Sequence, residues 1–517
     1  MALPYVFDAD RPAVVQNGDV LTFGVLDRRA KQIAQLMRGH GVEIGDHVAF
    51  CLENRLDFFS VIFASIYAGV HYTAISPYLH EDEIAYIVDN CGAKLVMGSE
   101  RTLPKMVQAR AECQAVHAWY TLDDAVEGYD ALGAAMAHQP IELPENPQEG
   151  IDMLYSSGST GRPKGVLRSR PDCVFGDDPD NARPIFNLNG LDNDTVYLNP
   201  APLYHAAPLR WTIGVLRRGG RVINMERFDA QACLDLVAEQ QVTHIQFVPT
   251  MMIRLLKLPE AVRAAADISS IRRIVHAAAP MPAEAKKQFI DWWGPIVDEY
   301  YGGTESNGLT YARCEDWLAN PGTVGQAALG VIHIIGPDDQ PLPSGQPGRV
   351  FFTGGMKFAY HKEPEKTAGA YLGEMSTLGD IGYVNDDGFL FLTDRDVNLI
   401  ISGGTNIYPQ LTEDTLVQHP GVTDAAAIGT PDADMGEVIL AVVEPSDPAL
   451  DRATLIDQLR SHCAEHLPTI RRPKHYEVVD AMPRHPNGKL RKVEMREHYR
   501  QVRAPATAPS GARGAPR

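Results

Sequence analysis

Short apolar runs alternate along most of this chain with longer stretches of helical period. DHVAFCL (46–52), AKLVMG (93–98) and THIQFV (243–248) are such runs, and LDRRAKQIAQLMRGHG (26–41) is such a helical stretch. This alternation is typical of α/β folds, in which helices cover largely parallel sheets. At 517 residues the chain is too long for one ordinary core, so two or more domains are expected.

The pattern becomes strand-rich after about residue 320. GRVFFTG (348–354) and GYVNDDGFLFLTD (382–394) predict hairpins in a small β subdomain, with Asp387-Gly388 as a turn pair. The segment from 422 to 467 predicts a compact α+β unit, and the Ala-, Pro-, Gly- and Arg-rich end predicts a disordered tail. The expected domains are therefore residues 1–395, residues 396–500 and a tail of residues 501–517.

The most apolar stretch, VIFASIYAGVHYTAI (61–75), is too short to predict a membrane span. It predicts instead a buried helix that passes through Ala68 and Gly69 into a strand. The N-terminus has no basic region followed by an apolar stretch, so no secretion signal is expected. Contact with a membrane surface is left open.

Composition favours a cytoplasmic globular protein. The chain is 44% hydrophobic and 22% charged, and its net charge of −19 disfavours nucleic acids as partners. Seven scattered cysteines without a CxxC pair predict neither a disulfide framework nor a zinc site, which fits a reducing compartment.

Residues 155–166 read YSSGSTGRPKGV, which predicts a phosphate-binding loop. Glycines let the backbone turn and bring N–H groups close to phosphate oxygens, and the hydroxyl residues and Lys164 add donors and positive charge. The lysine lies between Pro163 and Gly165, so the Gly-Lys-Ser/Thr ending of a P-loop is missing. A plain flexible connection is the alternative.

Three further segments follow in order: YYGGTE (300–305), TLGDIGYVNDDGFLFLTDR with IISGG (377–404), and PRHPNGKL (483–490). Together with the loop, they resemble the acyl-adenylate-forming (AMP-binding) superfamily, which includes acyl-CoA synthetases, from about residue 10 to about residue 500. The resemblance implies a large N-terminal adenylation domain, built of parallel α/β sheets and a small β subdomain, and a smaller mobile α+β C-terminal domain.

Forming an acyl-adenylate brings a carboxylate against the α-phosphorus of ATP, so the site needs cations to screen two negative groups. The resemblance implies ATP, Mg²⁺ and coenzyme A as cofactors and co-substrates. It assigns the β- and γ-phosphates to the loop residues Ser156, Ser157, Gly158, Ser159, Thr160, Gly161 and Lys164. Glu305 would hold Mg²⁺, with Thr160 as a second contact; a solvated surface carboxylate is the alternative for Glu305.

The nucleotide's other groups are assigned in the same way. Thr304 would touch the α-phosphate, and Tyr300, Tyr301 and Gly302 would lie along the adenine and the acyl channel. Asp380 and Arg395 match the family's ribose-binding pair. The small residues Ala277, Ala278 and Ala279 occupy the place of a strand that flanks adenine, although a packed core strand would read the same.

Lys489 resembles the family's C-terminal catalytic lysine, which bridges the carboxylate and the α-phosphate; most lysines at such a place are solvated surface residues. Gly403 and Gly404 would lie beside the pantetheine channel after the small domain rotates. Val397 stands where the family usually has a polar hinge residue, so either Asp396 takes that role or the hinge tolerates valine.

His205 falls where many acyl-CoA synthetases have a residue near the carboxylate pocket, and a buried histidine bonded to a backbone carbonyl is the alternative. The expected catalytic residues are thus Lys489, Thr304, Glu305 and His205. Arg210, Trp211 and the pair Trp292-Trp293 either shape the acyl pocket or belong to the core. No obvious fixed cation awaits a second carboxylate, which favours an apolar monocarboxylic acid.

These expectations converge on an ATP-dependent carboxylic acid:CoA ligase acting on a fatty or other hydrophobic acid, cyclic and steroidal acids included. No carrier domain follows the small domain, which disfavours a nonribosomal adenylation module. A ligase that loads a separate carrier protein and a non-catalytic nucleotide-binding regulator are the alternatives, and a luciferase-type oxygenase shares the motifs. The sequence leaves the oligomeric state open, a homodimer included.

Overall fold

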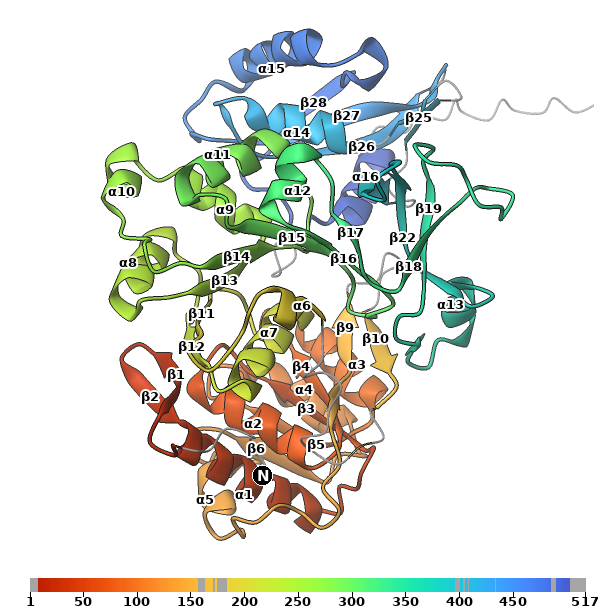
Figure 1. Ribbon diagram of the computed structural model, residues 1–517. Coiled ribbons are helices and arrows are strands. Elements are labelled where there is room, and N and C mark those ends of the chain that lie inside the picture. Colours follow the sequence, from red (N-terminus) through yellow and green to blue (C-terminus); the bar gives the residue numbers. More distant parts are fainter. Residues whose placement is uncertain are drawn as a thin grey trace, which may run out of the picture. The chain divides into compact units, whose positions relative to one another are not determined.

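The computed structural model describes residues 8–156, 163–170, 173, 184–395, 400–402, 405–407, 409–432, 434–484 and 490–502 (Figure 1). The chain divides into two compact units, one of residues 1–378 with 382–392 and the other of residues 379–381 with 393–517. The boundary predicted at residue 395 falls close to this division. The predicted fold class, α/β sheets with a β subdomain and a smaller α+β domain, is confirmed.

One layer of the first unit is a six-stranded parallel sheet. Its order is β7 (Asp130–Ala131), β6 (Ala118–Thr121), β5 (Ala93–Gly98), β3 (His47–Cys51), β4 (His71–Ile75) and β8 (Ile151–Asp152). The helices of this layer are α1 (Phe23–Gly39), α2 (Leu56–Tyr67), α3 (Glu81–Cys91), α4 (Leu103–Glu112) and α5 (Leu132–Ala137).

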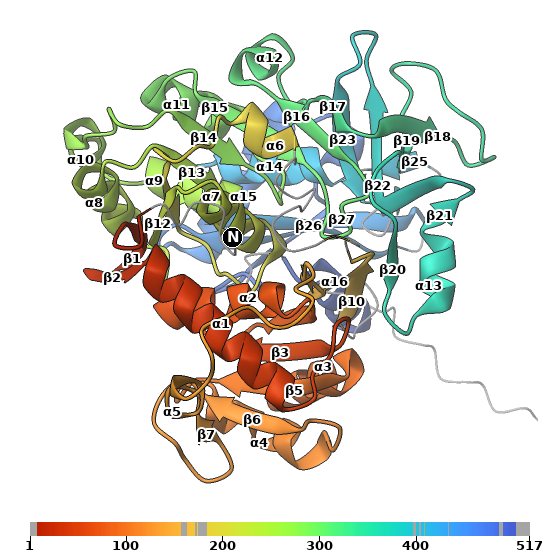
Figure 2. The same ribbon diagram turned by 60° about the horizontal axis from the view of Figure 1, so that its bottom comes forward.

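Strand β3 shows how this sheet is buried on both faces. Val48 and Phe50 belong to the core that contains α1 and α2, whereas Ala49 and Cys51 belong to the core that contains α3 and α4. Successive side chains of a strand point to opposite faces, so an unbroken apolar run fits a sheet covered on both sides. Figure 2 shows α1 and α2 over one face of this sheet.

The apolar stretch 61–75 folds as predicted. Helix α2 is buried along almost its whole length, and the chain turns at Gly69, whose φ is +66°, before β4 begins at His71. Left-handed backbone of this kind favours glycine. No helix in the described ranges is long and apolar enough to cross a membrane.

The second layer is a nine-stranded, mostly parallel sheet. Its order is β17 (Gln326–Leu329), β16 (Leu309–Ala312), β15 (Val297–Tyr301), β14 (Arg273–His276), β13 (His244–Phe247), β11 (Val196–Asn199), β12 (Arg221–Asn224), β1 (Pro12–Gln16) and β2 (Asp19–Thr22). Its helices are α6 (Pro184–Leu188), α7 (Ala206–Arg217), α8 (Ala230–Gln240), α9 (Pro249–Leu256), α10 (Glu260–Ala265), α11 (Ala283–Trp293) and α12 (Cys314–Ala319).

Helix α7 lies in the core that the two large sheets share. Leu209, Trp211 and Val215 of α7 are in the same apolar cluster as Tyr197 of β11 and Phe50 of β3. The opposite face of the nine-stranded sheet is covered by α8, α9 and α11, which form a second cluster. Residues of α7 can therefore reach both sheets.

Two small sheets complete the first unit. Strand β10 (Lys164–Arg168) lies between β9 (Leu154–Ser156) and β20 (Phe358–Tyr360), antiparallel to both. The other sheet contains β18 (Val331–Ile335), β19 (Gly348–Thr353), β22 (Met375–Val384) and β21 (Tyr371–Leu372), with β23 (Leu390–Arg395) paired to β22. Helix α13 (Pro364–Gly369) follows β20.

The second unit has its own core on both faces of β27 (Gly436–Pro445). This strand pairs with β26 (Val422–Asp432), β24 (Ile400–Ser402) and β28 (His475–Val478), and β25 (Thr405–Ile407) pairs with β24. The helices are α14 (Gln410–Gln418), α15 (Arg452–His466), α16 (Lys492–Val502) and the short 3₁₀ turn η3 (Thr469–Arg471). Val443 packs on the cluster with α14 and α15, and Val442 on the cluster with α16.

Candidate active site

The predicted phosphate loop lies between the antiparallel strands β9 and β10. Ser156 ends β9 and stands opposite Lys164, which begins β10. A Cβ at Gly165 would come within 3.1 Å of the Tyr155 ring and 3.3 Å of the His361 Cβ, so a glycine suits this close approach. The intervening loop residues Ser157, Gly158, Ser159, Thr160 and Gly161 lie outside the described residues.

Lys164 and Glu305 are brought to one place by Tyr360, a residue that the motifs do not include. The Lys164 ammonium lies 5.2 Å from the centre of the Tyr360 ring, and the Tyr360 hydroxyl donates to Glu305 Oε1 at 3.1 Å. Burial lowers the pKa of Lys164 and so does Lys366, while Glu363 and Glu305 act in the opposite direction. The site thus combines a cation and a buried carboxylate within reach of one phenol.

Thr304 and Glu305 belong to a tight turn between β15 and β16. The Ser306 N–H donates to the Gly303 carbonyl at 3.2 Å, and Ser306 has a φ of +57°. A Cβ at Gly303 would come within 2.7 Å of Glu305 Oε2 and of Leu378, which explains the glycine. The backbone of this turn is therefore tightly constrained around the two predicted catalytic residues.

Arg210 of α7 contacts this turn through its guanidinium. Its guanidinium donates to the Thr304 carbonyl at 2.9 Å and to Ser306 Oγ at 3.2 Å, and it pairs with Asp152 Oδ2 at 2.8 Å. The motifs include neither Arg210 nor Asp152 in these contacts. The sequence does give one indication of the ion pair. Asp152 stands in the apolar strand segment IDML (151–154), and a carboxylate is rarely buried in such a segment without a charged partner.

The three predicted small residues follow the end of β14. Ala277 is buried, whereas Ala278 and Ala279 are exposed, and Ala278 has a φ of +76°. Ala278 and Ala279 are therefore not residues of a packed core strand. Their small side chains and irregular backbone allow a ligand or another backbone to approach the carboxyl end of β14 closely.

A buried ionic cluster supports the ends of β14 and β15. Glu299 Oε2 lies 2.6 Å from Lys286 Nζ and 3.3 Å from His276 Nε2, and Lys286 also stands over the Trp317 ring. Burial alone would raise the pKa of Glu299, but His276 and Lys286 lower it to about 2. His276 and Glu299 are register partners that directly precede Ala277 and Tyr300, so the cluster fixes both chain segments from within.

Tyr300 and Tyr301 point to opposite sides of β15. The Tyr300 ring lies 6.5 Å from Trp211, and the Tyr301 ring lies 6.2 Å from Phe352 of β19. Trp211 in turn stacks on Tyr197 at 6.0 Å and meets Phe186 edge to face at 5.6 Å. Tyr300 is thus backed by a layer of aromatic side chains.

His205 caps the start of α7 next to Tyr204, with the two rings 4.3 Å apart. Burial lowers the pKa of His205 to about 4, so the imidazole is neutral at neutral pH. Its Nε2 is buried and has no hydrogen-bond partner among the residues that the structure describes.

The remaining predicted residues belong to or border the second unit. Asp380 is buried in β22, and Arg395 ends β23, the strand paired with β22. Gly403, Gly404, Lys489 and the hinge residues Asp396 and Val397 lie outside the described residues. Trp293 packs in the core, stacked on Phe289 at 5.4 Å, rather than at the 300–305 turn.

Two family models match the chain. Residues 6–358 match the AMP-binding enzyme model, and residues 411–489 match the AMP-binding enzyme C-terminal domain model. The chain therefore belongs to the AMP-binding family of adenylate-forming enzymes, and the resemblance predicted from the motifs is confirmed. Within that family it is an AMP-forming acid–thiol ligase, which works through an acyl-AMP intermediate.

Relatives match along nearly their whole length. A feruloyl-CoA synthase from Amycolatopsis sp is 31% identical over 494 residues, covering 94% of this chain and 96% of that protein. The long-chain-fatty-acid–CoA ligase FadD13 of Mycobacterium tuberculosis is 28% identical, with 93% of each chain covered. The crystal structure of ATP-bound MatB from Rhodopseudomonas palustris superposes with a TM-score of 0.82 at 27% identity, over 97% of this chain and 98% of that one.

Proposed function

We propose that this enzyme makes an acyl-CoA thioester from ATP, CoA and a compact hydrophobic monocarboxylic acid, with an aryl acid as the first candidate. The main support for this proposal is the aromatic layer of Trp211, Tyr197 and Phe186 that packs beside Tyr300. Trp211 and Phe186 are each 3% exposed and Tyr197 is fully buried, so they fill the space on that side of the turn. A flat acyl group suits a short aromatic wall better than a long extended chain does.

The preference for one carboxylate rests on how Arg210 is used. Four of its hydrogen bonds go to Asp152, to the Thr304 carbonyl and to Ser306 Oγ. A guanidinium has five N–H donors, so little of this one is left for a second acid group of a substrate. A dicarboxylic or sulfonated acid would lack its obvious cation at this end of α7.

The donor set at Glu305 also suits Mg²⁺. This ion is usually held by one or two carboxylates together with phosphate oxygens and waters, and Glu305 offers such a carboxylate. Glu305 would hold the ion, with Thr160 as a second contact, and Mg²⁺ would supply charge neutralisation at the phosphates. Lys164 would add its ammonium on the β- and γ-phosphate side.

The residues then serve two successive steps. In the first, a carboxylate oxygen of the acid forms a bond to the α-phosphorus of ATP and pyrophosphate leaves, with Lys489 and Thr304 at the reacting groups. In the second, the thiolate of CoA attacks the acyl carbon and the bond to AMP breaks. The buried, neutral His205 would border the acyl group without adding a charge beside the carboxylate.

The relatives support the ligase and divide over the acid. By their names, one acts on a feruloyl group and another on long-chain fatty acids. The aromatic layer favours the first kind of substrate for this chain.

The test measures AMP release by the purified enzyme with ATP, Mg²⁺ and CoA. The acids are ferulate, benzoate, octanoate, palmitate and malonate, and Lys489→Ala is the inactive control. We expect CoA-dependent AMP release to be fastest with an aryl acid. Faster turnover of palmitate or malonate would contradict the proposed acid, and transfer to a carrier protein but not to CoA would contradict the proposed acceptor.

Trp211→Leu tests the aromatic layer itself. Opening space beside Tyr300 should move the preference toward octanoate and palmitate relative to the aryl acid. An unchanged order of substrates would show that the acyl group does not lie against this layer.

A further inference from the structure

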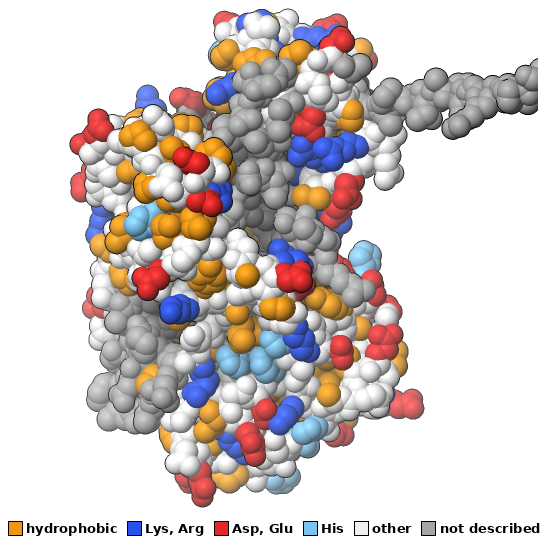
Figure 3. All heavy atoms as spheres, turned by 90° about the vertical axis from the view of Figure 1, so that its right-hand side faces the viewer, with side chains coloured by type: hydrophobic (Ala, Val, Ile, Leu, Met, Phe, Trp, Pro, Cys, Tyr) orange, Lys and Arg blue, Asp and Glu red, His pale blue; other side chains and the backbone are white. Residues whose placement is uncertain are grey.

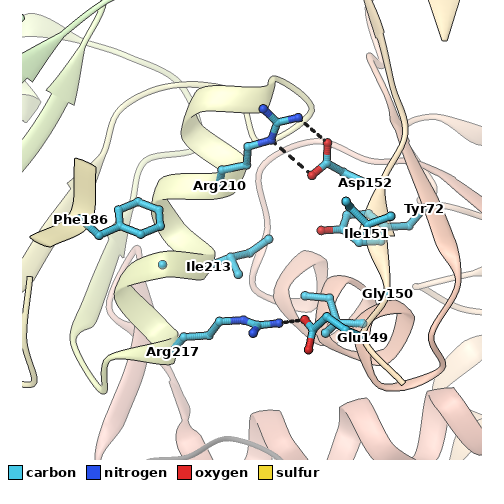
Figure 4. Close-up of a pocket in the computed structure, with 11 residues that line it drawn as sticks. Tyr72, Glu149, Gly150, Ile151, Asp152, Phe186, Arg210, Ile213 and Arg217 are labelled. Atoms are coloured by element: carbon cyan, nitrogen blue, oxygen red, sulfur yellow. Dashed lines mark hydrogen bonds and ion pairs between the residues drawn. The ribbon is translucent and has the colours of Figure 1, made fainter. Parts of the chain in front are cut away.

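Helix α7 presents two arginines, the partly buried Arg210 and the buried Arg217, to the segment that leads into the phosphate loop. Arg210 pairs with Asp152 and Arg217 pairs with Glu149 (Figure 4). The pocket between the helix and this segment has a volume of about 20 Å³, too small for a substrate. These charges therefore act on the protein itself.

The two arginines differ in what else they hold. Arg210 also donates to the Thr304 carbonyl and to Ser306 Oγ. Asp152, its carboxylate partner, is the last residue of β8 and stands two positions before β9, which leads into the phosphate loop. Asp152 also accepts from Arg168 of β10, whose side chain is fully buried. Arg210 thus joins the base of the phosphate loop to the turn that carries Thr304 and Glu305.

The turn needs such support because Ser306 adopts left-handed backbone. A non-glycine residue in this region is strained, because its Cβ approaches the following carbonyl oxygen. The hydrogen bond from Arg210 to Ser306 Oγ and the one from the Met356 N–H to the Ser306 carbonyl, at 3.0 Å, oppose that strain. Without them the turn is free to relax and to carry Thr304 and Glu305 away from the nucleotide.

We propose that Arg210, oriented by Asp152, is a positioning residue for acyl-adenylate formation: it fixes the 302–306 turn relative to the phosphate loop. The inference rests on the proposed roles of Thr304 and Glu305. A lysine could not replace it, because one ammonium cannot reproduce a planar fork that donates to a carboxylate, a carbonyl and a hydroxyl at once.

Arg217 supplies the matched control. It lies seven residues further along the same helix, so it emerges on the same face, and it also forms an ion pair with a buried carboxylate, that of Glu149. Arg217→Met and Arg210→Met therefore each remove one guanidinium from one buried carboxylate. They differ in their contact with the 302–306 turn.

The experiment uses the full chain and measures ATP–pyrophosphate exchange with the best acid of the panel at varied concentrations of ATP and Mg²⁺. Thermal unfolding of each variant is measured in parallel. We expect Arg210→Met to lower the maximal exchange rate by about 100-fold while the KM for the acid changes little. Arg210→Lys should recover little of this loss. Arg217→Met should lower the melting temperature comparably and leave the maximal rate within about twofold.

A folded Arg210→Met enzyme with a wild-type maximal rate would overturn the proposal. So would an Arg217→Met enzyme with an equal loss of rate, because the effect would then be one of stability. Should Arg210→Met fail to fold, Ser306→Ala removes only the hydroxyl contact and should still lower the maximal rate several-fold; an unchanged rate would overturn the proposal. Exchange by the wild-type enzyme is measured first, so that failure of the proposed function is distinguished from failure of this inference.

Discussion

Tyr360 joins two charged side chains that lie far apart in the sequence. Its ring faces the Lys164 ammonium and its hydroxyl donates to Glu305. A ring face attracts a cation, and a phenol donates a hydrogen bond to a carboxylate, so one side chain holds both groups without neutralising either. The spacing of Lys164 and Glu305 therefore depends on Tyr360.

We predict that Tyr360→Phe weakens metal use more than ATP binding. The ring under Lys164 stays, but Glu305 loses the hydrogen bond that orients it. The Mg²⁺ concentration for half-maximal pyrophosphate exchange should rise by about tenfold, because a hydrogen bond to a charged group contributes roughly 1.5 kcal/mol.

Tyr120→Phe is the control for that change, since it removes the hydrogen bond between Tyr120 of β6 and His40, the C-cap residue of α1. It should leave the Mg²⁺ dependence as in the wild type. An unaltered Mg²⁺ dependence in Tyr360→Phe would show that the hydroxyl does not orient Glu305.

At this scale the motifs predict residues but not their partners. Lys164 and Glu305 stand in recognisable local patterns, whereas Tyr360 stands in FAYHK, which carries no motif. Its role follows from the pairing of β20 with β10, where Tyr360 and Val166 are register partners. A long-range strand pairing of that kind leaves no periodic signal in the sequence.

The buried Lys286–Glu299 pair stabilises the carboxyl ends of β14 and β15. We predict that Lys286→Met lowers the free energy of unfolding by about 3–5 kcal/mol, because it removes a principal partner of a buried carboxylate. Urea unfolding followed by circular dichroism measures the change. Adding Glu299→Gln to Lys286→Met should recover much of the loss.

The neighbouring Lys287 is exposed on the same helix, so Lys287→Met is the matched control and should change stability by less than about 0.5 kcal/mol. Equal effects of the two lysine variants would contradict a structural role for the buried pair.

Strands β3 and β4 bring histidines together on one face of the first unit. His47 and His71 are register partners with rings stacked at 4.7 Å, and the His361 ring lies 5.6 Å from His47. Figure 3 shows a group of histidine side chains on the face in view. Burial lowers the pKa of His47 to about 3 and that of His71 to about 4. The charged groups that face them are Asp46 and Lys362 at His47, and Arg168, Arg170 and Asp152 at His71.

We predict that this group makes the first unit sensitive to acid. Both histidines have a folded pKa below the unfolded value of about 6.5, so the unfolded chain binds more protons as the pH falls. The free energy of unfolding should therefore keep its full value above about pH 6.5 and fall toward pH 4. The loss should be at most about 3 kcal/mol per histidine, and solvent screening makes it smaller.

Urea unfolding at a series of pH values measures this slope. His47→Gln with His71→Gln should flatten it, whereas His117→Gln, at an exposed position, should not. A slope that survives the double change would assign the acid sensitivity to other groups.

At the scale of elements, the sequence predicts the helices and strands whose hydrophobic period and turn residues are local. The passage from α2 through Gly69 into β4 and the alternation of strands with helices follow from hydrophobic period and turn residues. The position of Ala278 does not follow. HAAAP reads equally well as a packed strand, and only the end of β14 at His276 places two of its alanines in an exposed turn.

At the scale of the whole chain, the two units have separate hydrophobic cores. The second is of a length at which a domain can fold alone. A cut after residue 395 retains the complete β22–β23 pair on the first fragment, and it is also the boundary that the sequence predicts.

We predict that residues 8–395 and residues 396–502 each fold as separately purified fragments, with cooperative thermal transitions. The first fragment should bind ATP, since Lys164, Thr304 and Glu305 all belong to it. It should catalyse pyrophosphate exchange at least about 100-fold more slowly than the full chain, because the loss of Lys489 removes a cation from the reacting phosphate. Full-length Lys489→Ala should show the same loss with ATP binding intact. Exchange by the first fragment at the full-chain rate would place the whole adenylation chemistry in the first unit and would contradict the role proposed for Lys489.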